Sequence, residues 1–395
     1  MLQQTPFHPR TSAINQLQNW RRWSGYYTAG LYEMTHEREY WAVRNSAALF
    51  DVSPLMKYLI KGKDAGRLLN RVVTRDVLKM SVGQVIYTPW CNHEGKVLDD
   101  GTISRLDDQT YRMTSADPNL RWLNMNAAGM DVSITDISAE LAALSLQGPK
   151  STKILSRCAK NTVDNLKYFR WMTNEIAGAA ISISRTGYTG DLGYEIWMNP
   201  QDALKVWDAI METGHDYAIT PAGILALDVA RVEAGLILIE TDYTAAHHAI
   251  IETQKSSPFE LGLGWAVNLD KPVFNGKAAL QREKELGSEW MFVGLEVDWP
   301  GMERVYREVG LPPQIPATTV RASLPVYVGS AQVGYASSSA WSPVLKKYIA
   351  MAHLRRPYYE IGTVVGLEVT VEHQRKVAPA RVVKTPFYEP EWKKK

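Results

Sequence analysis

The stretch from Arg185 to Trp197, which reads RTGYTGDLGYEIW, constrains the fold of this chain more than any other. Apolar and polar residues alternate before it, at 181–184, and near its end, at 194–198, which predicts two strands joined by a glycine-rich reversal. The glycines permit positive φ and close backbone approach. Tyr188 offers an aromatic face and Glu195 a bidentate acceptor, which together suit a flat heterocycle with N–H donors along one edge. An ordinary hairpin with turn glycines explains the same residues equally simply.

Length, composition and net charge limit the classes of protein to which this chain can belong. A chain of 395 residues can form two or three domains with sizeable cores, and 45% apolar with 22% charged residues is typical of a soluble globular protein. The net charge of +2 gives no electrostatic reason to expect nucleic acid or an anionic membrane as a partner. The sequence has no apolar run long enough to span a membrane and no signal-peptide core in residues 1–22. We therefore expect a cytoplasmic protein.

Cysteine and aromatic usage adds two expectations. Cys91 and Cys158 cannot build a disulfide framework, and neither has the spacing of a metal ligand, so we expect a reducing compartment and no metal. The chain has 13 Trp and 19 Tyr, more than a core requires. Some of them are therefore available to line a pocket for a planar ligand.

Helical and strand patterns alternate over the first 290 residues, which predicts an α+β fold. Apolar spacing predicts a helix over 36–50, a second helix that Asn199 caps with Pro200 at its first position, and a third over 220–235 with Pro221 at its first position. A polar helical connector is expected at 278–288. Beyond it, alternating segments predict a compact all-β domain. These segments are 292–297, 324–328, 332–336, 348–352 and 366–371.

Two adjacent carboxylates, Asp99 and Asp100, stand near the end of an apolar run. In a strand they point to opposite faces, so one can face the interior while the other faces solvent. A buried carboxylate must be hydrogen-bonded, or its pKa rises. The pair is explained either as a turn before Gly101 or as a site with a catalytic carboxylate.

Arg231 lies on the apolar face of the third predicted helix. A guanidinium in such a place requires a partner. Asp228 or Glu233 can supply an internal ion pair, and an anionic ligand is the alternative.

Six short stretches carry a resemblance to a known family. They are 50–53 (FDVS), 95–100 (GKVLDD), 144–149 (LSLQGP), 185–195, 230–235 (ARVEAG) and 334–345 (GYASSSAWSPVL). Taken together and in this order, they resemble the tetrahydrofolate-dependent aminomethyltransferase family, whose best-known member is the T-protein of the glycine cleavage system. The resemblance extends over about residues 36–375.

The family resemblance implies a three-domain cloverleaf around a central folate channel. Residues 1–52 and 145–277 would form a discontinuous folate-binding domain, and 53–144 a second α+β domain. Residues 289–385 would form a C-terminal β-barrel or jelly-roll-like domain.

The resemblance also implies roles for individual residues. Glu195 would hold the pterin edge, and Asp100 would lie beside the reactive nitrogens of tetrahydrofolate. A carboxylate suits both tasks, because it accepts charge-assisted hydrogen bonds and handles protons. The remaining folate contacts would be Tyr87 and Tyr188 packed on the folate, Leu55 under the ring, Ser115 where the family has an asparagine, and Arg231 at a carboxylate of the folate tail.

The sequence departs from the T-protein pattern mainly around the expected donor side. Pro54 and Leu55 replace His-Met, Ser115 replaces Asn, and 240–242 (ETD) replaces Gly-Asn-Asp. We therefore expect a demethylase or methylenetransferase branch that moves a methyl or methylene group from a small donor, such as an aromatic methyl ether or a methylenedioxy compound. Candidate donor-side residues are Tyr27, Tyr32, Tyr243, His247 and His248.

Two other functions fit the same residues. A true T-protein would take an aminomethyl group from lipoylated H-protein, a partner expected only in that case. A folate-binding regulatory or RNA-modification-associated protein would have no donor chemistry. Asp100 argues against the last possibility, because binding alone needs no carboxylate at the reactive nitrogens.

Overall fold

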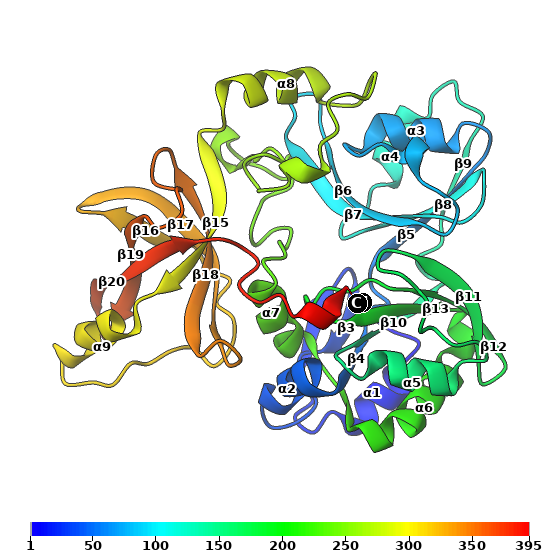
Figure 1. Cartoon of the computed structure of the whole chain (residues 1–395), viewed down its shortest axis with the longest axis horizontal. Coiled ribbons are helices and arrows are strands. Elements are labelled where there is room, and N and C mark those ends of the chain that lie inside the picture. The colour runs from blue at the N-terminus through cyan, green and yellow to red at the C-terminus, as the bar shows by residue number, and fades with distance from the viewer. Residues whose placement is uncertain (1, 395) are drawn as a thin grey trace.

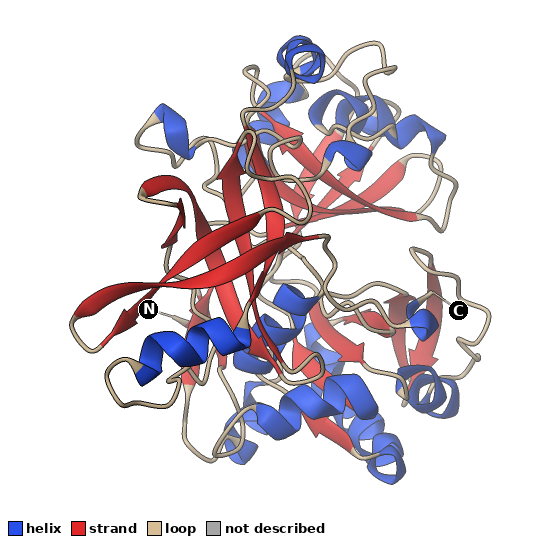
Figure 2. Cartoon of the chain, turned by 60° about the vertical axis from the view of Figure 1, so that its left-hand side comes forward, coloured by secondary structure: helices blue, strands red, loops and turns tan. Residues whose placement is uncertain are grey.

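The structure is a computed structural model in which residues 2–394 are described. Three β units lie around a common centre, as Figure 1 shows: a six-stranded sheet, a five-stranded sheet and a closed barrel. Helices cover the two open sheets, while the barrel is formed almost entirely of strands (Figure 2). The expected α+β fold with a C-terminal barrel is confirmed. Among the described residues we find no helix whose length and apolarity would let it cross a membrane.

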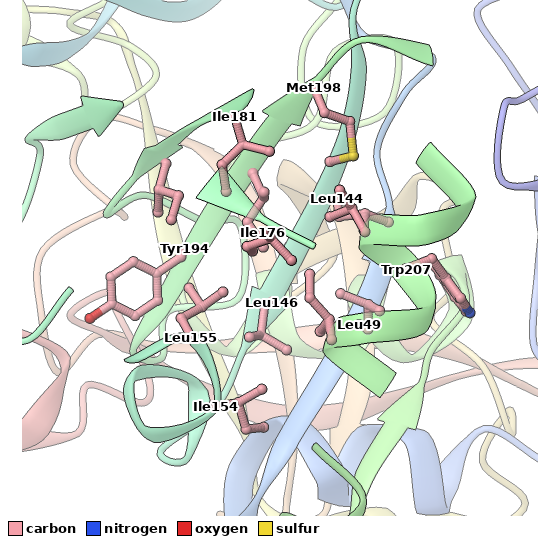
Figure 3. Close-up of a cluster of buried hydrophobic side chains, with 14 of the residues drawn as sticks. Leu49, Leu144, Leu146, Ile154, Leu155, Ile176, Ile181, Tyr194, Met198 and Trp207 are labelled. Atoms are coloured by element: carbon pink, nitrogen blue, oxygen red, sulfur yellow. The ribbon is translucent and has the colours of Figure 1, made fainter. Parts of the chain in front are cut away.

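The six-stranded sheet has the order β11-β12-β13-β10-β4-β14 and is antiparallel except for the pair β4 and β14. Helices cover both of its faces. Leu49, Leu144 and Trp207 belong to the core under α5 and α6 (Figure 3), and Phe50 packs on the opposite side with α2 and α7. Its elements are α2 (Glu37–Asn45), β4 (Ala47–Asp51), β10 (Ala142–Gln147), α5 (Ser151–Cys158), β11 (Trp171–Ile176), β12 (Ala179–Ser184), β13 (Gly193–Met198), α6 (Ala203–Gly214), β14 (Ile219–Pro221) and α7 (Ile224–Glu233).

The five-stranded sheet has the order β6-β7-β8-β5-β9 and is antiparallel throughout. Leu68 and Leu69 of α3 and Leu123 of α4 close its core. Its elements are β5 (Met56–Lys61), α3 (Ala65–Val72), β6 (Val85–Cys91), β7 (Val97–Arg105), β8 (Thr110–Ser115), α4 (Leu120–Asn126) and β9 (Ser133–Asp136).

The barrel closes in the order β15-β18-β17-β16-β19-β20. Met302 and Val305 of α9 pack against its core. Its elements are β15 (Trp290–Val297), α9 (Trp299–Arg307), β16 (Leu324–Val328), β17 (Ala331–Ser342), β18 (Lys347–Arg355), β19 (Val364–Val371) and β20 (Gln374–Val383). The connector expected at 278–288 is largely the exposed helix α8 (Lys277–Leu286).

The first residues form a small ribbon, in which β3 lies between β1 and β2. It is tied to the six-stranded sheet by the Thr5 hydroxyl, which donates to Asp51 at 2.5 Å. Its elements are β1 (Gln3–Gln4), α1 (His8–Ile14), β2 (Trp20–Trp23) and β3 (Tyr26–Ala29).

Two helix predictions were wrong in their limits. The helix over 36–50 ends at Asn45, and Ala47–Asp51 is the strand β4, whose two faces are both buried. A strand buried on both sides is a continuous apolar run without alternation, so periodicity alone does not distinguish it from a helix. The third helix begins at Ile224, because Pro221 belongs to β14, which pairs with β4.

The domain limits remain a prediction. The five-stranded sheet runs from Met56 to Asp136 and the barrel from Trp290 to Val383, and β10 begins at Ala142. Between α7 and α8 the chain crosses the centre of the molecule without a long helix or strand, and this segment carries Tyr243 and His247.

Candidate functional site

The glycine-rich stretch forms a loop between β12 and β13, which pair directly, with Ser184 opposite Glu195. The Thr186 hydroxyl donates to Glu195 Oε2 at 2.5 Å. A Cβ at Gly187 or Gly193 would lie 2.1 Å from the side chain of Gln147, so only glycine allows the loop to close over this glutamine. The loop is therefore built to present Glu195 at the end of the sheet.

Glu195 is enclosed by the protein and has few partners. Burial raises the pKa of its carboxyl, and the hydrogen bond from Thr186 offsets part of that rise. The guanidinium of Arg112 lies 4.4 Å from the ring centre of Trp197. Burial lowers the pKa of Arg112 to about 10, and the Glu195 carboxylate opposes part of that fall. Within residues 2–394 no hydrogen bond is found to Oε1 of Glu195. This oxygen is therefore available to accept an N–H from a ligand.

Asp99 and Asp100 have different environments, as expected for neighbours in a strand. Asp99 is fully buried and accepts hydrogen bonds from the backbone N–H of Asp100 at 2.7 Å, from that of Asp117 at 3.0 Å and from Asn119 Nδ2 at 2.8 Å. These bonds use both of its oxygens. Asp99 is therefore a structural carboxylate that fixes the position of its neighbour.

Asp100 is half-buried and is held by tyrosines. The Tyr243 hydroxyl donates to Asp100 Oδ1, and the Tyr87 hydroxyl also hydrogen-bonds to this carboxylate. Burial raises the pKa of Asp100, and the two hydroxyls partly oppose that rise. A Cβ at Gly101 would lie 2.0 Å from the carbonyl oxygen of Thr114, so the strand after Asp100 runs closer to β8 than another residue would allow.

Tyr188 connects the glycine-rich loop with the segment that follows α7 and lies near Asp100. Its hydroxyl donates to the backbone carbonyl of Ile237, in the segment that leads to Tyr243. Burial raises the pKa of this hydroxyl, and the nearby Asp100 carboxylate raises it further. Tyr87 of β6 lies close enough to be affected by Tyr188 in the same way. Tyr87, Tyr188, Asp100 and Tyr243 therefore come together at the centre of the molecule.

Arg231 has internal partners. Its guanidinium is almost fully buried, bonds to Asp228 at 2.8 Å and to Ser338 at 2.8 Å, and forms an ion pair with Asp242. Of the two alternatives left by the sequence, the internal ion pair is the one observed. The contact predicted between Arg231 and a folate carboxylate gains no support, because these partners already satisfy the charge.

Leu55 and Ser115 lie at the same end of the five-stranded sheet, because Leu55 directly precedes Met56, which pairs with Ser115. Leu55 is half-buried against the α2 and α7 core, and Ser115 is buried, with its hydroxyl donating to the carbonyl of Asp117 at 2.7 Å. In this position Ser115 fixes a turn next to Asp99. Its predicted role in contacting folate remains a prediction.

The five donor-side candidates do not form one group. Tyr243 contacts Asp100, whereas Tyr27 packs on His8 and Trp20 in the ribbon, and Tyr32 is buried. None of the contacts found in the described part of the chain joins Tyr27 or Tyr32 to Asp100. The ring of His247 packs on that of His248, and both are exposed.

Sequence reasoning did not identify Thr186, Arg112 or Asp117, although all three contact predicted site residues or their supports. Thr186 lies inside the glycine-rich stretch. Arg112 is a buried charge between Tyr111 and Met113, and a charge flanked by apolar residues was a usable signal. Asp117 gave no signal, because its link to Asp99 exists only in three dimensions.

Comparisons with known proteins identify the family. Residues 9–271 match the family model described as GCVT N-terminal domain, and residues 307–389 match the Glycine cleavage T-protein C-terminal barrel domain. An aminomethyltransferase of Halothermothrix orenii is 34% identical over 353 residues, covering 88% of this chain and 90% of that protein. An aminomethyltransferase of Caldanaerobacter subterraneus subsp. tengcongensis is 35% identical over 361 residues, covering 90% of this chain and 88% of that protein.

One solved structure supports the fold. The crystal structure of glycine cleavage system aminomethyltransferase T from Bartonella henselae superimposes with a TM-score of 0.83, covering 98% of this chain and 99% of that chain at 22% identity. The expected family, the transferase class and the use of tetrahydrofolate are confirmed. One family model matches more than half of the chain, and relatives at 34% and 35% identity match nearly all of it. This chain therefore belongs to the tetrahydrofolate-dependent aminomethyltransferase family.

Proposed function

We propose that this enzyme transfers a one-carbon unit to tetrahydrofolate held between Glu195 and Asp100, and that the unit is an aminomethyl carbon carried by a lipoylated H-protein. The observation that carries the proposal is the Asp100 carboxylate held by the Tyr243 hydroxyl, with Tyr188 of the glycine-rich loop near enough for the Asp100 charge to raise its pKa; Glu195 follows in the same stretch of chain. A free carboxylate oxygen on one side and a tyrosine-held carboxylate on the other suit one ligand with an N–H edge and reactive amines.

Each residue has a distinct task in this proposal. Glu195 accepts hydrogen bonds from the pterin edge and orients it, while Tyr87 and Tyr188 pack on the folate, with Leu55 under its ring. Asp100 manages the proton of the reacting nitrogen and stabilises positive charge that develops there. The Tyr243 hydroxyl keeps the Asp100 carboxylate in place and in its ionised form.

The aminomethyl donor is favoured by the relatives. Those compared with this chain are named aminomethyltransferases and align over about nine tenths of its length. A protein donor also suits a site whose nearby histidines, His247 and His248, are exposed at the surface.

Residues that depart from the family pattern support a second candidate, the demethylase or methylenetransferase with a small donor. Pro54, Leu55 and Ser115 stand where the T-protein has other residues. The Tyr243 hydroxyl, on the expected donor side, hydrogen-bonds directly to Asp100. An aromatic methyl ether or methylenedioxy compound would place its oxygen near this tyrosine. In such a reaction the donor oxygen must be protonated as it leaves.

One assay separates the two candidates. The purified chain is incubated with tetrahydrofolate and either aminomethyl-loaded H-protein or a panel of methyl ethers, methylenedioxy aromatics, sulfonium compounds and methylamines. Mass analysis of the folate product then distinguishes methyl from methylene transfer. We expect methylene-tetrahydrofolate with H-protein, formed far more slowly by Asp100→Asn. Product from the small donors alone would establish the second candidate, and no folate product with any donor would refute both.

A further inference from the structure

A cluster of two histidines and an aspartate, the side-chain types that bind transition metals, lies beside the proposed folate site, and none of the three has a role in the chemical step proposed above. Asp117 follows β8, while His247 and His248 belong to the segment between α7 and α8. One ligand atom from each of the three lies within 4.8 Å of the others. The carboxylate of Glu240 is close by, with Oε1 3.0 Å from His248 Nδ1.

Hydrogen bonds fix the backbone on both sides of this cluster. The N–H of Asp117 donates to Asp99 at 3.0 Å, and its carbonyl accepts from Ser115 at 2.7 Å and from Asn119 at 3.0 Å. On the other side, the N–H of Ala246 donates to the carbonyl of Val97 at 2.8 Å. The two segments are therefore held against the same strand, β7, and the side chains start from positions that the fold determines.

One oxygen of the cluster lacks a partner. Oδ2 of Asp117 is inaccessible to solvent and, within the described residues, accepts no hydrogen bond. His248 Nδ1 lies 3.5 Å from this oxygen. A buried carboxylate oxygen left unbonded is unfavourable, and a bound cation would remove that penalty.

The ligand types indicate the class of metal. Two imidazoles with one or two carboxylates suit zinc and similar transition metals, whereas magnesium and calcium prefer oxygen ligands alone. Zinc binds at about 2.0–2.2 Å from nitrogen or oxygen, so the ligand atoms must approach one another by small side-chain rotations. The exposed side chains of His247 and His248 leave room for those rotations.

We propose that Asp117, His247 and His248 bind one divalent transition-metal ion of the zinc class, with Glu240 as a fourth ligand or as the hydrogen-bond partner of His248. The sequence predicted no metal, because the ligands come from distant segments and show no ligand spacing. Asp117 keeps 23% and His248 keeps 44% of its side chain exposed, so the ion is reachable from solvent and an additional ligand has room to bind. This site does not depend on the proposed transfer.

The test measures zinc binding to the full chain without folate or donor. Protein stripped with a chelator is titrated with ZnCl2 in competition with a chromophoric chelator, and with MgCl2 as the selectivity control. We expect one zinc per chain. The double variant His247→Ala/His248→Ala should weaken binding by on the order of 100-fold or more, and Asp117→Asn by on the order of 10- to 100-fold. Magnesium should not compete.

Two variants control for binding elsewhere. His215→Ala removes an exposed histidine that lies beside Asp216, and Cys158→Ser removes a partly accessible thiol. Both should bind zinc as the wild type does. Thermal unfolding gives a second readout: zinc should raise the midpoint of the wild type and not that of the double variant, and both apoproteins should show one cooperative transition.

The proposal is overturned if the wild type binds no stoichiometric zinc, or if the double variant and Asp117→Asn bind it as tightly as the wild type. In either case the cluster is a set of histidine–carboxylate ion pairs. Because the assay contains neither folate nor donor, its failure leaves the transfer proposal intact, and a failed transfer assay leaves the metal site intact.

Discussion

Tyr243→Phe is the most informative single substitution, because it removes one hydroxyl that donates to Asp100 and leaves the ring in place. The bond favours the ionised carboxylate, whereas burial favours the neutral acid. Removing the hydroxyl therefore raises the pKa of Asp100. If transfer requires the ionised form, the acid limb of the pH–rate profile moves to higher pH.

The size of the shift follows from the strength of the bond. A hydrogen bond to a charged group contributes about 1.5–3 kcal/mol, and one pKa unit corresponds to about 1.4 kcal/mol. Loss of the whole bond would therefore raise the pKa of Asp100 by about 1–2 units at most. Because Tyr87 still bonds to the carboxylate, we expect the pKa to rise by about 1 unit. On the acid limb the rate of the variant would be lower by about tenfold, and it would approach the wild-type rate at high pH.

The measurement is kcat/KM for tetrahydrofolate across the pH range, with whichever donor the transfer assay identifies. Tyr348→Phe is the matched control, because it removes a buried hydroxyl that bonds to Ser339 at 2.9 Å inside the barrel, and no hydrogen bond found among the described residues joins it to Asp100. An acid limb that does not move in Tyr243→Phe, or that moves equally in Tyr348→Phe, would refute the role assigned to the Tyr243–Asp100 contact.

Three further predictions concern the other parts of the site. Glu195→Gln should weaken tetrahydrofolate binding by about 10- to 100-fold, because a charge-assisted hydrogen bond of about 1.5–3 kcal/mol is lost. Calorimetry measures the affinity for tetrahydrofolate, and an unchanged affinity would contradict the role of Glu195 at the pterin edge. Asp100→Asn should lower turnover by about 10²- to 10⁴-fold and leave folate affinity nearly constant, as separate kinetic and binding assays would show. Asp242→Ala should destabilise the protein by on the order of 3 kcal/mol in urea unfolding, because Arg231 loses a buried partner, whereas Asp208→Ala, at an exposed ion pair, should have little effect.

The elements that could be predicted are those whose pattern is local. The strands around the glycine-rich stretch and the β-rich C-terminal part follow from the spacing of neighbouring residues, and the structure has them. Asn199 also acts as a cap, of the 3-10 turn Pro200–Asp202 that leads into α6. The strand at Ala47–Asp51 could not be assigned, because burial on both faces removes the alternation that marks a strand.

The sequence by itself determined the family and the fold class, and it indicated the two carboxylates proposed for the site, since Glu195 and Asp100 lie within short motifs. Only the tertiary structure decided what each of them touches. Tyr243 meets Asp100 across 143 residues of chain, and Arg231 is satisfied by Asp242 and Ser338 instead of remaining open to a ligand. Such partners come from separate elements, and packing of those elements sets their distances, so no spacing along the chain records them.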